Sequence, residues 1–420
     1  MIPRLGPTIV LLAALGVGTA AAAPADPVFS DTGPDAEAYG AAKGYPVPAK
    51  DFPYEYITQG LLVGHYSHFD QVRTLRAVPT VGPASELKRA TTEIRPVYGY
   101  DRRLKTIGDF LHDNPITGLL IARDDTILYE HYQYGRTDQD RFLTQSMAKT
   151  VTGMLVGIAL AEGAIHSIDD KVEAYVPELA GSEYGATPIR ALLQMSSGID
   201  YRETYQPDDD STKLVRNLVV AAAPGAIVAV RQFNTRAAAP GTRFNYSSAD
   251  TEVLGLVVSR AVHRPLADYL SDRIWKKLGA EADAGWLTDP TGQELAFCCM
   301  VARLRDWARF GLMLAHDGQW NGQQIVPKQW ILDSTTVPKD SYLAPGRLSP
   351  ILGYGYQVWI SYGERRRFSL LGIHGQSMLI DPVTKLVLVG TAVRPEAAGG
   401  PSGVELADLW YAVLAQYGPK

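Results

Sequence analysis

The sequence predicts an α/β protein in which an antiparallel sheet, built from both ends of the chain, is flanked by helices and interrupted by a mostly helical region. Strand hairpins are predicted near both ends, and a long helical, loop-rich stretch lies between them. The 420 residues can bury a large core, and 46% hydrophobic with 20% charged residues is an ordinary globular composition. A disordered, collagen-like or coiled-coil chain is therefore disfavoured.

Short apolar runs on either side of turn residues predict the strands. The turn at 123–125 joins the two strands of a first hairpin, and the turn at 381–385 joins those of a second. Helical periodicity begins at 104–111 and returns in an amphipathic segment that closes the chain. The expected elements are strands at 118–122, 126–132, 378–380 and 386–393, and a final helix at 403–417.

The N-terminus is typical of a secretory signal peptide, which we expect over residues 1–23. Arg4 provides the positive start, residues 9–17 form a short apolar run, and alanines at 20–22 supply small residues for cleavage. The run is shorter than the roughly 20 apolar residues that a membrane-spanning helix needs, and no other stretch reaches that length. We therefore expect a periplasmic or secreted protein with no membrane span in the mature chain.

The rest of the chain is expected to divide into two parts. Residues 24–100 are rich in Pro, Gly and Tyr with little periodicity, which predicts an extended N-terminal arm of unassigned role. Residues 101–420 form one domain. Its sheet region is expected at about 101–140 and 290–420, and its helical region at about 141–289.

Charge and cysteine content exclude several function classes. The net charge is −5 and no basic run is longer than three residues, so nucleic-acid binding is disfavoured. Cys298 and Cys299 are adjacent, and the separation of neighbouring residues is too short for the preferred disulfide geometry. We therefore expect two buried thiols that act as small apolar residues, with no disulfide, no metal site and no cofactor.

Catalytic motifs of several enzyme classes are missing, and one short motif remains. The sequence contains no G-x-S-x-G, H-E-x-x-H, P-loop or Rossmann glycine pattern. An S-x-x-K occurs twice, at Ser146–Lys149 and at Ser85–Lys88. Because Ser85 and Lys88 lie among charged residues, that lysine should stay solvated and protonated.

Ser146 lies in a different context. Apolar residues recur at helical spacing from 151 to 158, so Ser146 is expected in the first turn of a buried helix with Thr144 as an N-cap. One turn separates Ser146 from Lys149, which places both on one face. Desolvation would lower the pKa of the Lys149 amine, so that it could accept the serine proton.

Two further segments complete the pattern. Tyr246 lies in a Tyr-Ser-Ser stretch just before an apolar helix, and the segment 372–376 reads Gly-Ile-His-Gly-Gln before a predicted strand. The order S-x-x-K, then Y-S-S, then a glycine-rich strand start resembles the serine hydrolases of the class C β-lactamase and penicillin-binding-protein superfamily. Within it, the segment 372–376 and the residues after Tyr246 are most similar to 6-aminohexanoate-oligomer hydrolases and related carboxylesterases.

The resemblance implies a β-lactamase/transpeptidase-like fold and a metal-independent mechanism. Ser146 matches the acylated nucleophile, Lys149 its general base, and Tyr246 the phenol that protonates the leaving group. The backbone N–H groups of Ser146 and Ile373 match an oxyanion hole, with Gln376 or Ser377 as alternatives to Ile373 if the register is shifted. His374 and Gln376 are candidate substrate-binding residues, although His374 could equally hold the strand.

The departures from the family pattern bear on the substrate. Ser248 stands where β-lactamases have asparagine, and the Lys-Thr-Gly that binds a β-lactam carboxylate is missing. A loop tyrosine that contacts the substrate amide in the 6-aminohexanoate hydrolases has its counterpart in Tyr205, or else in Tyr201. The resemblance thus implies hydrolysis of small esters or linear amides. The alternatives are a D-amino-acid peptidase, a weak β-lactamase, or a non-catalytic sensor on the same fold.

Overall fold

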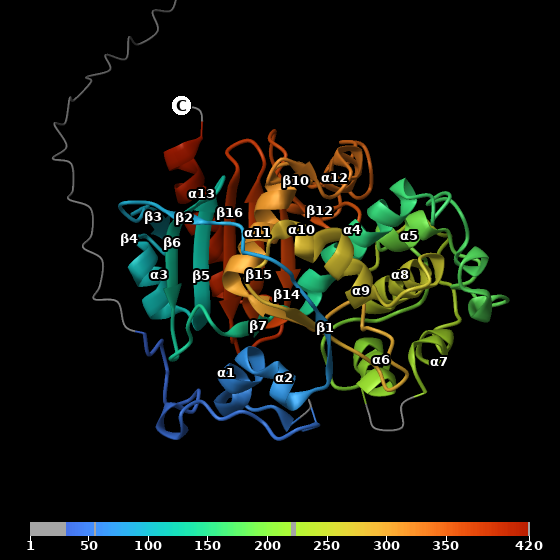
Figure 1. The fold of residues 1–420 in the computed structure, drawn as a ribbon, viewed down its shortest axis with the longest axis horizontal. Coiled ribbons are helices and arrows are strands. Elements are labelled where there is room, and N and C mark those ends of the chain that lie inside the picture. Colours follow the sequence, from blue (N-terminus) through green and yellow to red (C-terminus); the bar gives the residue numbers. More distant parts are fainter. Residues whose placement is uncertain (1–30, 54–55, 220–223, 419–420) are drawn as a thin grey trace, which may run out of the picture.

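An eight-stranded sheet forms the centre of the computed structural model, which describes residues 31–53, 56–219 and 224–418. Its strand order is β12-β13-β14-β15-β16-β5-β6-β2, and all neighbours are antiparallel except β2, which is parallel to β6 (Figure 1). Its strands are β2 (Lys88–Arg89), β5 (Ile116–Arg123), β6 (Thr126–Tyr132), β12 (Leu352–Tyr354), β13 (Trp359–Ser361), β14 (Phe368–Gly372), β15 (Gln376–Asp381) and β16 (Leu386–Ala392).

Both predicted hairpins are confirmed, and they meet at the centre of the sheet. β5 pairs with β6 and β15 with β16, while β16 also pairs with β5, where Leu388 lies opposite Ile121. The strands are buried on both faces, as their continuous apolar runs require. Leu119 and Ile121 enter the core on one face, and Leu120 and Ala122 the core on the other.

Helices cover the two faces of this sheet. The predicted terminal helix is confirmed as α13 (Pro401–Tyr417), which packs with α3 (Ile107–Asp113) on one face. A capping box formed by Thr106 and Asp109 begins α3. On the other face, α11 (Leu304–Ala315) brings Gly311 so close to the sheet that an added Cβ would lie 2.7 Å from Val387. The α/β class and flanked antiparallel sheet are therefore as predicted.

The middle of the chain forms the helical region seen beside the sheet in Figure 1. α4 and α8 lie against each other and are buried on nearly all sides. The helices are α4 (Ala148–Ala161), α5 (Ile189–Leu193), α6 (Asp210–Val219), α7 (Ala226–Arg231), α8 (Ser248–Ala261), α9 (Leu266–Leu270), α10 (Lys276–Leu278) and, nearer the C-terminus, α12 (Lys328–Thr335).

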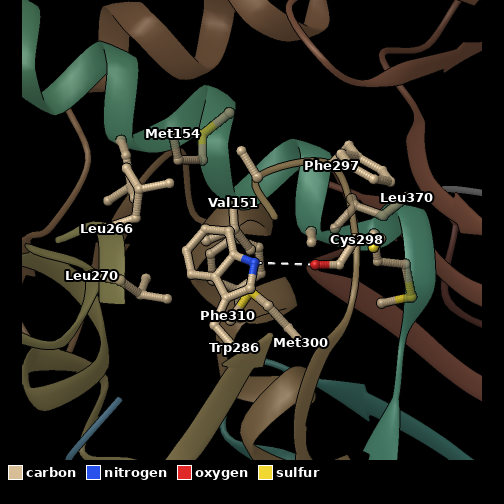
Figure 2. Packing of buried hydrophobic residues seen from close by; sticks show 14 of the residues in the cluster. Val151, Met154, Leu266, Leu270, Trp286, Phe297, Cys298, Met300, Phe310 and Leu370 are labelled. Carbon is tan, nitrogen blue, oxygen red and sulfur yellow. Dashed lines mark hydrogen bonds between the residues drawn. The ribbon is translucent and has the colours of Figure 1, made fainter. Parts of the chain in front are cut away.

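A second, four-stranded sheet joins the two regions, and the sequence analysis did not predict it. Its order is β1-β8-β9-β7, with bounds β1 (Leu75–Val78), β7 (Arg141–Leu143), β8 (Ala284–Leu287) and β9 (Met300–Arg303). Strands of three or four residues are too short to show an alternating pattern. On β8, Trp286 packs among Val151, Met154, Leu266 and other apolar side chains in the core that Figure 2 shows.

The N-terminal segment is less extended than expected. It contains α1 (Gln59–Ser67) and α2 (Phe69–Val72), it contributes β1 and β2 to the two sheets, and it ends in β3 (Tyr98–Tyr100), which pairs with β4 (Arg103–Lys105). Residues 62–67 of α1 are all buried, so the helix has no polar face that would reveal its period. The signal peptide expected at 1–23 lies outside the described residues. In the described ranges no helix could span a membrane.

Candidate active site

Ser146 lies where the small sheet meets the helical region. β7 ends at Leu143, residues Gln145–Met147 form a single 3₁₀ turn, and α4 begins at Ala148. The expected N-cap is not formed, because both the N–H and the hydroxyl of Thr144 bond to the carbonyl of Met300, at 3.0 and 3.2 Å. Thr144 thus continues the pairing of β7 with β9, and its hydroxyl is not available to cap the helix. Ser146 is half-buried and lies in the 3₁₀ turn just before the helix.

Lys149 is only 2% exposed, and its amine contacts three oxygens. Nζ lies 2.9 Å from Ser146 Oγ, 3.1 Å from Ser248 Oγ and 3.1 Å from the carbonyl oxygen of Phe297. Burial lowers the pKa of Lys149 to about 8, while the charges of Glu203 and Glu252 act in the opposite direction. The neutral amine is therefore accessible near physiological pH.

Tyr246 lies on the loop just before α8, whose N-cap Ser247 accepts a hydrogen bond from the N–H of Asp250. The Tyr246 ring stacks on Trp359 with centroids 5.6 Å apart, and Lys149 Nζ lies 5.0 Å from the Tyr246 ring centroid. Burial and the charge of Glu203 raise the pKa of Tyr246, while a hydrogen bond between its side chain and that of Ser146 lowers it. Its phenol therefore stays protonated and can donate.

Glu203 is an acidic residue of the site that the sequence analysis missed. Its carboxylate accepts hydrogen bonds from the N–H and the hydroxyl of Ser248, at 2.7 and 2.9 Å. Burial raises the pKa of Glu203, and the positive charge of Lys149 lowers it. A single glutamate in a loop gives no spacing signal, so only the fold could reveal that it lies beside Lys149.

The two candidate loop tyrosines are placed differently. The side chain of Tyr205 hydrogen-bonds to Glu203. Burial raises the pKa of Tyr205, and the nearby phenol of Tyr246 and the Glu203 carboxylate raise it further. Tyr201 is 3% exposed and packs edge-on against Phe233 at 5.0 Å, within the core. Tyr205 is therefore at the site and Tyr201 is not.

The glycine-rich segment forms a tight turn between β14 and β15, in which Gly372 lies opposite Gln376. An added Cβ on Gly372 would lie 2.6 Å from the carbonyl oxygen of Thr144 and 3.1 Å from Cβ of Gln145. Only glycine allows this approach. The turn that begins with Ile373 is thereby held next to the 3₁₀ turn that contains Ser146.

His374 and Gln376 support this turn. His374 Nδ1 lies 2.6 Å from the carbonyl oxygen of Arg394, and the amide of Gln376 donates to the carbonyl oxygen of Ala392 at 2.7 Å. Gln376 is 1% exposed, so a substrate has no access to its side chain. Ser377 is also buried, and its hydroxyl donates to the carbonyl of Gly375 at 3.1 Å. The structure therefore gives Gln376 a position inside the loop and not on a substrate-binding surface.

The adjacent cysteines correct an expectation. Cys298 and Cys299 form a disulfide and are not free thiols. The expectation of two thiols was based on the short separation of neighbouring residues; the two Cα atoms are indeed only 3.7 Å apart, yet the sulfurs are bonded. The bonded pair directly follows Phe297, whose carbonyl holds Lys149, and Trp286 Nε1 donates to the carbonyl of Cys298 at 3.0 Å (Figure 2).

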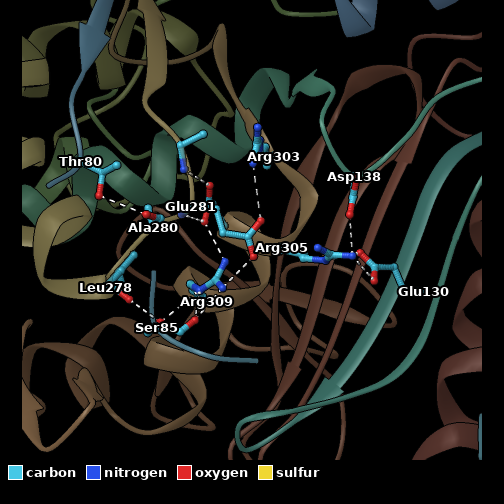
Figure 3. A network of polar contacts seen from close by, with 12 residues as sticks. Thr80, Ser85, Glu130, Asp138, Leu278, Ala280, Glu281, Arg303, Arg305 and Arg309 are labelled. Atoms are coloured by element: carbon cyan, nitrogen blue, oxygen red, sulfur yellow. Dashed lines mark hydrogen bonds and ion pairs between the residues drawn. The ribbon is translucent and has the colours of Figure 1, made fainter. Parts of the chain in front are cut away.

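In the second S-x-x-K, the serine and the lysine contact other groups and not each other. Ser85 Oγ donates to the carbonyl of Leu278 at 2.8 Å and lies 3.1 Å from Arg309 Nε, within the polar network of Figure 3. Lys88 is exposed and pairs with Asp125 at 2.7 Å. Serine and lysine therefore have separate partners here. Within the described ranges, no cluster of three or more His, Cys, Asp or Glu could hold a metal ion.

Comparison with known proteins agrees with this arrangement. The family model described as "Beta-lactamase" matches residues 105–403. The chain is 31% identical over 326 residues to the 6-aminohexanoate-dimer hydrolase of Paenarthrobacter ureafaciens, covering 73% of this chain and 80% of the relative.

Two solved structures show the shared fold. A putative 6-aminohexanoate-dimer hydrolase from Bacillus anthracis superposes with a TM-score of 0.75 at 23% identity, covering 86% of this chain and 96% of the other. EstCE1, a hydrolase with promiscuous acyltransferase activity, superposes with a TM-score of 0.57 at 18% identity, covering 71% and 93%. The family match spans more than half of the sequence and includes every residue of the site described above. The chain therefore belongs to the β-lactamase family, has its fold, and is a hydrolase.

Proposed function

We propose that this chain is a serine hydrolase that cleaves small esters or linear amides through an acyl-enzyme on Ser146. The hydrogen bonds of Lys149 carry the proposal. The Phe297 carbonyl can only accept, and the Ser248 hydroxyl accepts as well, because it donates its one proton to Glu203. These two oxygens take the N–H donors of a neutral Lys149. The remaining lone pair faces Ser146, which is the arrangement of a base beside its nucleophile.

In the acylation step, Ser146 Oγ attacks the substrate carbonyl carbon and passes its proton to Lys149 Nζ. The carbonyl π electrons move to the oxygen, which the backbone N–H groups of Ser146 and Ile373 stabilise by hydrogen bonding. The contact of Gly372 with Thr144 and Gln145 supports Ile373 as the second donor, because it holds these two backbones side by side.

The leaving group departs with a proton from Tyr246. The phenol hydrogen-bonds to Ser146 and lies beside Lys149, so it can donate to the leaving oxygen or nitrogen and recover a proton from the lysine. The bond between the carbonyl carbon and the leaving group breaks, and an acyl-enzyme remains. Water then adds to the acyl carbon, gives up a proton to the same pair, and releases the acid as Ser146 regains its hydrogen.

The site and the relative's name both support the proposed substrate class. A 6-aminohexanoate dimer is a linear amide, and Tyr205 lies beside Tyr246, where a substrate amide would be held. Ser248 in place of asparagine and the missing Lys-Thr-Gly argue against strong β-lactamase and peptidase activity. The retained contact between Lys149 and Ser146 argues against a non-catalytic sensor.

A fluorophosphonate probe tests the proposal directly. Intact mass should show one adduct on the wild-type protein and none on Ser146→Ala, and p-nitrophenyl esters and aminohexanoate dimers should be hydrolysed only by the wild type. Labelling and turnover that persist in Ser146→Ala would reject Ser146 as the nucleophile. Nitrocefin hydrolysis faster than that of every ester would reject the substrate class.

A further inference from the structure

One buried side chain from the N-terminal segment contacts the side chains of two residues that flank the donors of the proposed oxyanion hole. Tyr66 of α1 is 1% exposed. Its hydroxyl accepts a hydrogen bond from the side-chain amide of Gln145 at 3.0 Å, and its ring lies edge-on to the His374 ring with centroids 5.6 Å apart. Gln145 directly precedes Ser146, and His374 directly follows Ile373. Tyr66 therefore joins the neighbours of the two N–H donors.

Both residues that Tyr66 contacts have left-handed backbones. Gln145 has φ of 49° and His374 has φ of 60°. A side chain makes this conformation unfavourable, so it persists only where the surroundings fix it. The Ser146 N–H belongs to the peptide that follows Gln145, so its orientation depends on what holds Gln145 in place. The Ile373 N–H belongs to the preceding peptide, between Gly372 and Ile373, and its position depends on the shape of the turn that includes His374.

Other contacts hold each turn and bring the two turns together. The ring of His374 is held by Arg394, whose carbonyl oxygen lies 2.6 Å from Nδ1. The backbone N–H of His374 donates to the carbonyl of Ala397 at 2.9 Å. Gly372 fixes how closely the two turns approach. Tyr66 adds a side-chain contact to both turns at once, which links Gln145 to His374 across that approach.

We propose that Tyr66 is a positioning residue that holds the turn of Ser146 and the turn of Ile373 in a fixed orientation to each other, which gives α1 a part in positioning the two oxyanion donors. The inference rests on the proposed acyl-enzyme mechanism. It extends that mechanism to a segment outside the family match, which begins at residue 105. It also gives a role to an N-terminal segment whose sequence shows no motif.

Tyr66→Phe tests the hydroxyl contact, because it keeps the ring against His374 and removes the acceptor for Gln145. We expect kcat for a p-nitrophenyl ester to fall about tenfold with KM nearly unchanged, less than the 10²- to 10³-fold loss when an oxyanion donor is deleted. Binding of an arylboronic acid, whose tetrahedral adduct places an oxygen in the hole, should weaken by a similar factor. Tyr39→Phe, a buried tyrosine of the same segment that packs on Tyr134, is the matched control and should retain wild-type kcat.

Gln145→Met provides the second arm, since it removes the amide donor at similar length. It should reproduce the Tyr66→Phe effect, and the double variant should lose no more than either single variant. A kcat within twofold of wild type for both single variants would overturn the role of Tyr66, as would a loss of kcat without weaker boronate binding. If Ser146→Ala also retains activity, the proposed mechanism itself fails. An inactive Ser146→Ala beside a fully active Tyr66→Phe overturns only the present inference.

Discussion

Two serine–lysine pairs with the same three-residue spacing differ in almost every physical property. Ser146 and Lys149 lie 2.9 Å apart, and the lysine is 2% exposed. Ser85 instead donates to a backbone carbonyl, and Lys88 lies at the surface against Asp125. The motif therefore supplies two side chains, and only burial of the pair gives the properties that the proposed base and nucleophile require. Desolvation lowers the pKa of Lys149, whereas the ion pair with Asp125 raises the pKa of Lys88.

The largest difference in activity between the two pairs is expected when each serine is replaced in turn. Ser146→Ala removes the atom that becomes acylated, so kcat/KM for p-nitrophenyl butyrate should fall on the order of 10⁶-fold. Ser85→Ala should leave kcat/KM within about twofold of wild type. It should instead lower the melting temperature, because Ser85 bonds to Leu278 and Arg309. Comparable activity in the two variants would contradict the assignment.

Replacing each lysine in turn should also change kcat/KM differently, but by a smaller factor than replacing the serines. Lys149→Ala should lower kcat/KM by about 10²- to 10⁴-fold, as expected for loss of a general base, and Lys88→Ala should have no measurable effect. Tyr246→Phe should also cause a large loss, because it removes the donor to the leaving group. In the wild type, kcat/KM should rise with pH through an apparent pKa near 8 that belongs to the coupled pair. A pH profile that both substitutions leave unchanged would assign the base elsewhere.

Charge next to each lysine gives a sharper test. The Glu203 carboxylate favours the protonated form of Lys149, so Glu203→Gln should lower the lysine pKa and move the acidic limb of the kcat/KM profile to lower pH. Glu86→Gln, beside Lys88, is the matched control and should move nothing. An acidic limb that stays in place in Glu203→Gln would show that the carboxylate does not act on the base.

A second comparison, between Tyr205 and Tyr201, concerns substrate preference. The change in rate expected here is the smallest. An amide needs its nitrogen protonated and aligned, whereas a p-nitrophenyl ester expels a good leaving group unaided. Tyr205→Phe should lower hydrolysis of an aminohexanoate dimer roughly tenfold and that of the ester less than threefold. Tyr201→Phe should leave the ratio of the two rates unchanged, since Tyr201 lies in the core. Equal effects on ester and amide would remove Tyr205 from amide recognition.

The sequence predicts those elements whose apolar residues recur with a clear period and those residues that belong to a recognisable motif. The two hairpins and the terminal helix follow from apolar runs long enough to show a period, and the proximity of Ser146 to Lys149 follows from a motif at the start of a helix. The small sheet was missed because its strands have only three or four residues. α1 was missed because it is buried all round and shows no polar face.

The rest of the site depends on residues that are distant in the sequence. Glu203, the carbonyl of Phe297 and Tyr66 come from three segments without a motif, and only tertiary packing brings them to Lys149 and Gln145. Every residue has a backbone carbonyl, so no pattern of residue types can indicate which carbonyl contacts Lys149. The disulfide was missed because adjacent cysteines are closer together than the preferred disulfide geometry requires, and this pair is bonded with its Cα atoms only 3.7 Å apart.

The pairing of β5 with β16 has a consequence for how the molecule folds. These two strands form the middle of the main sheet, yet one is near the start of the family domain and the other near the end of the chain. A sheet closed by such distant segments has a high contact order, and its formation is slow because a long loop must close first. The helix that follows Ser146 is synthesised before the middle of the chain, whereas β14 and the turn after it lie within about the last fifty residues. An incomplete chain would therefore contain Ser146 and Lys149 without the second donor of the proposed oxyanion hole, and we expect hydrolytic activity only after the last strands are in place.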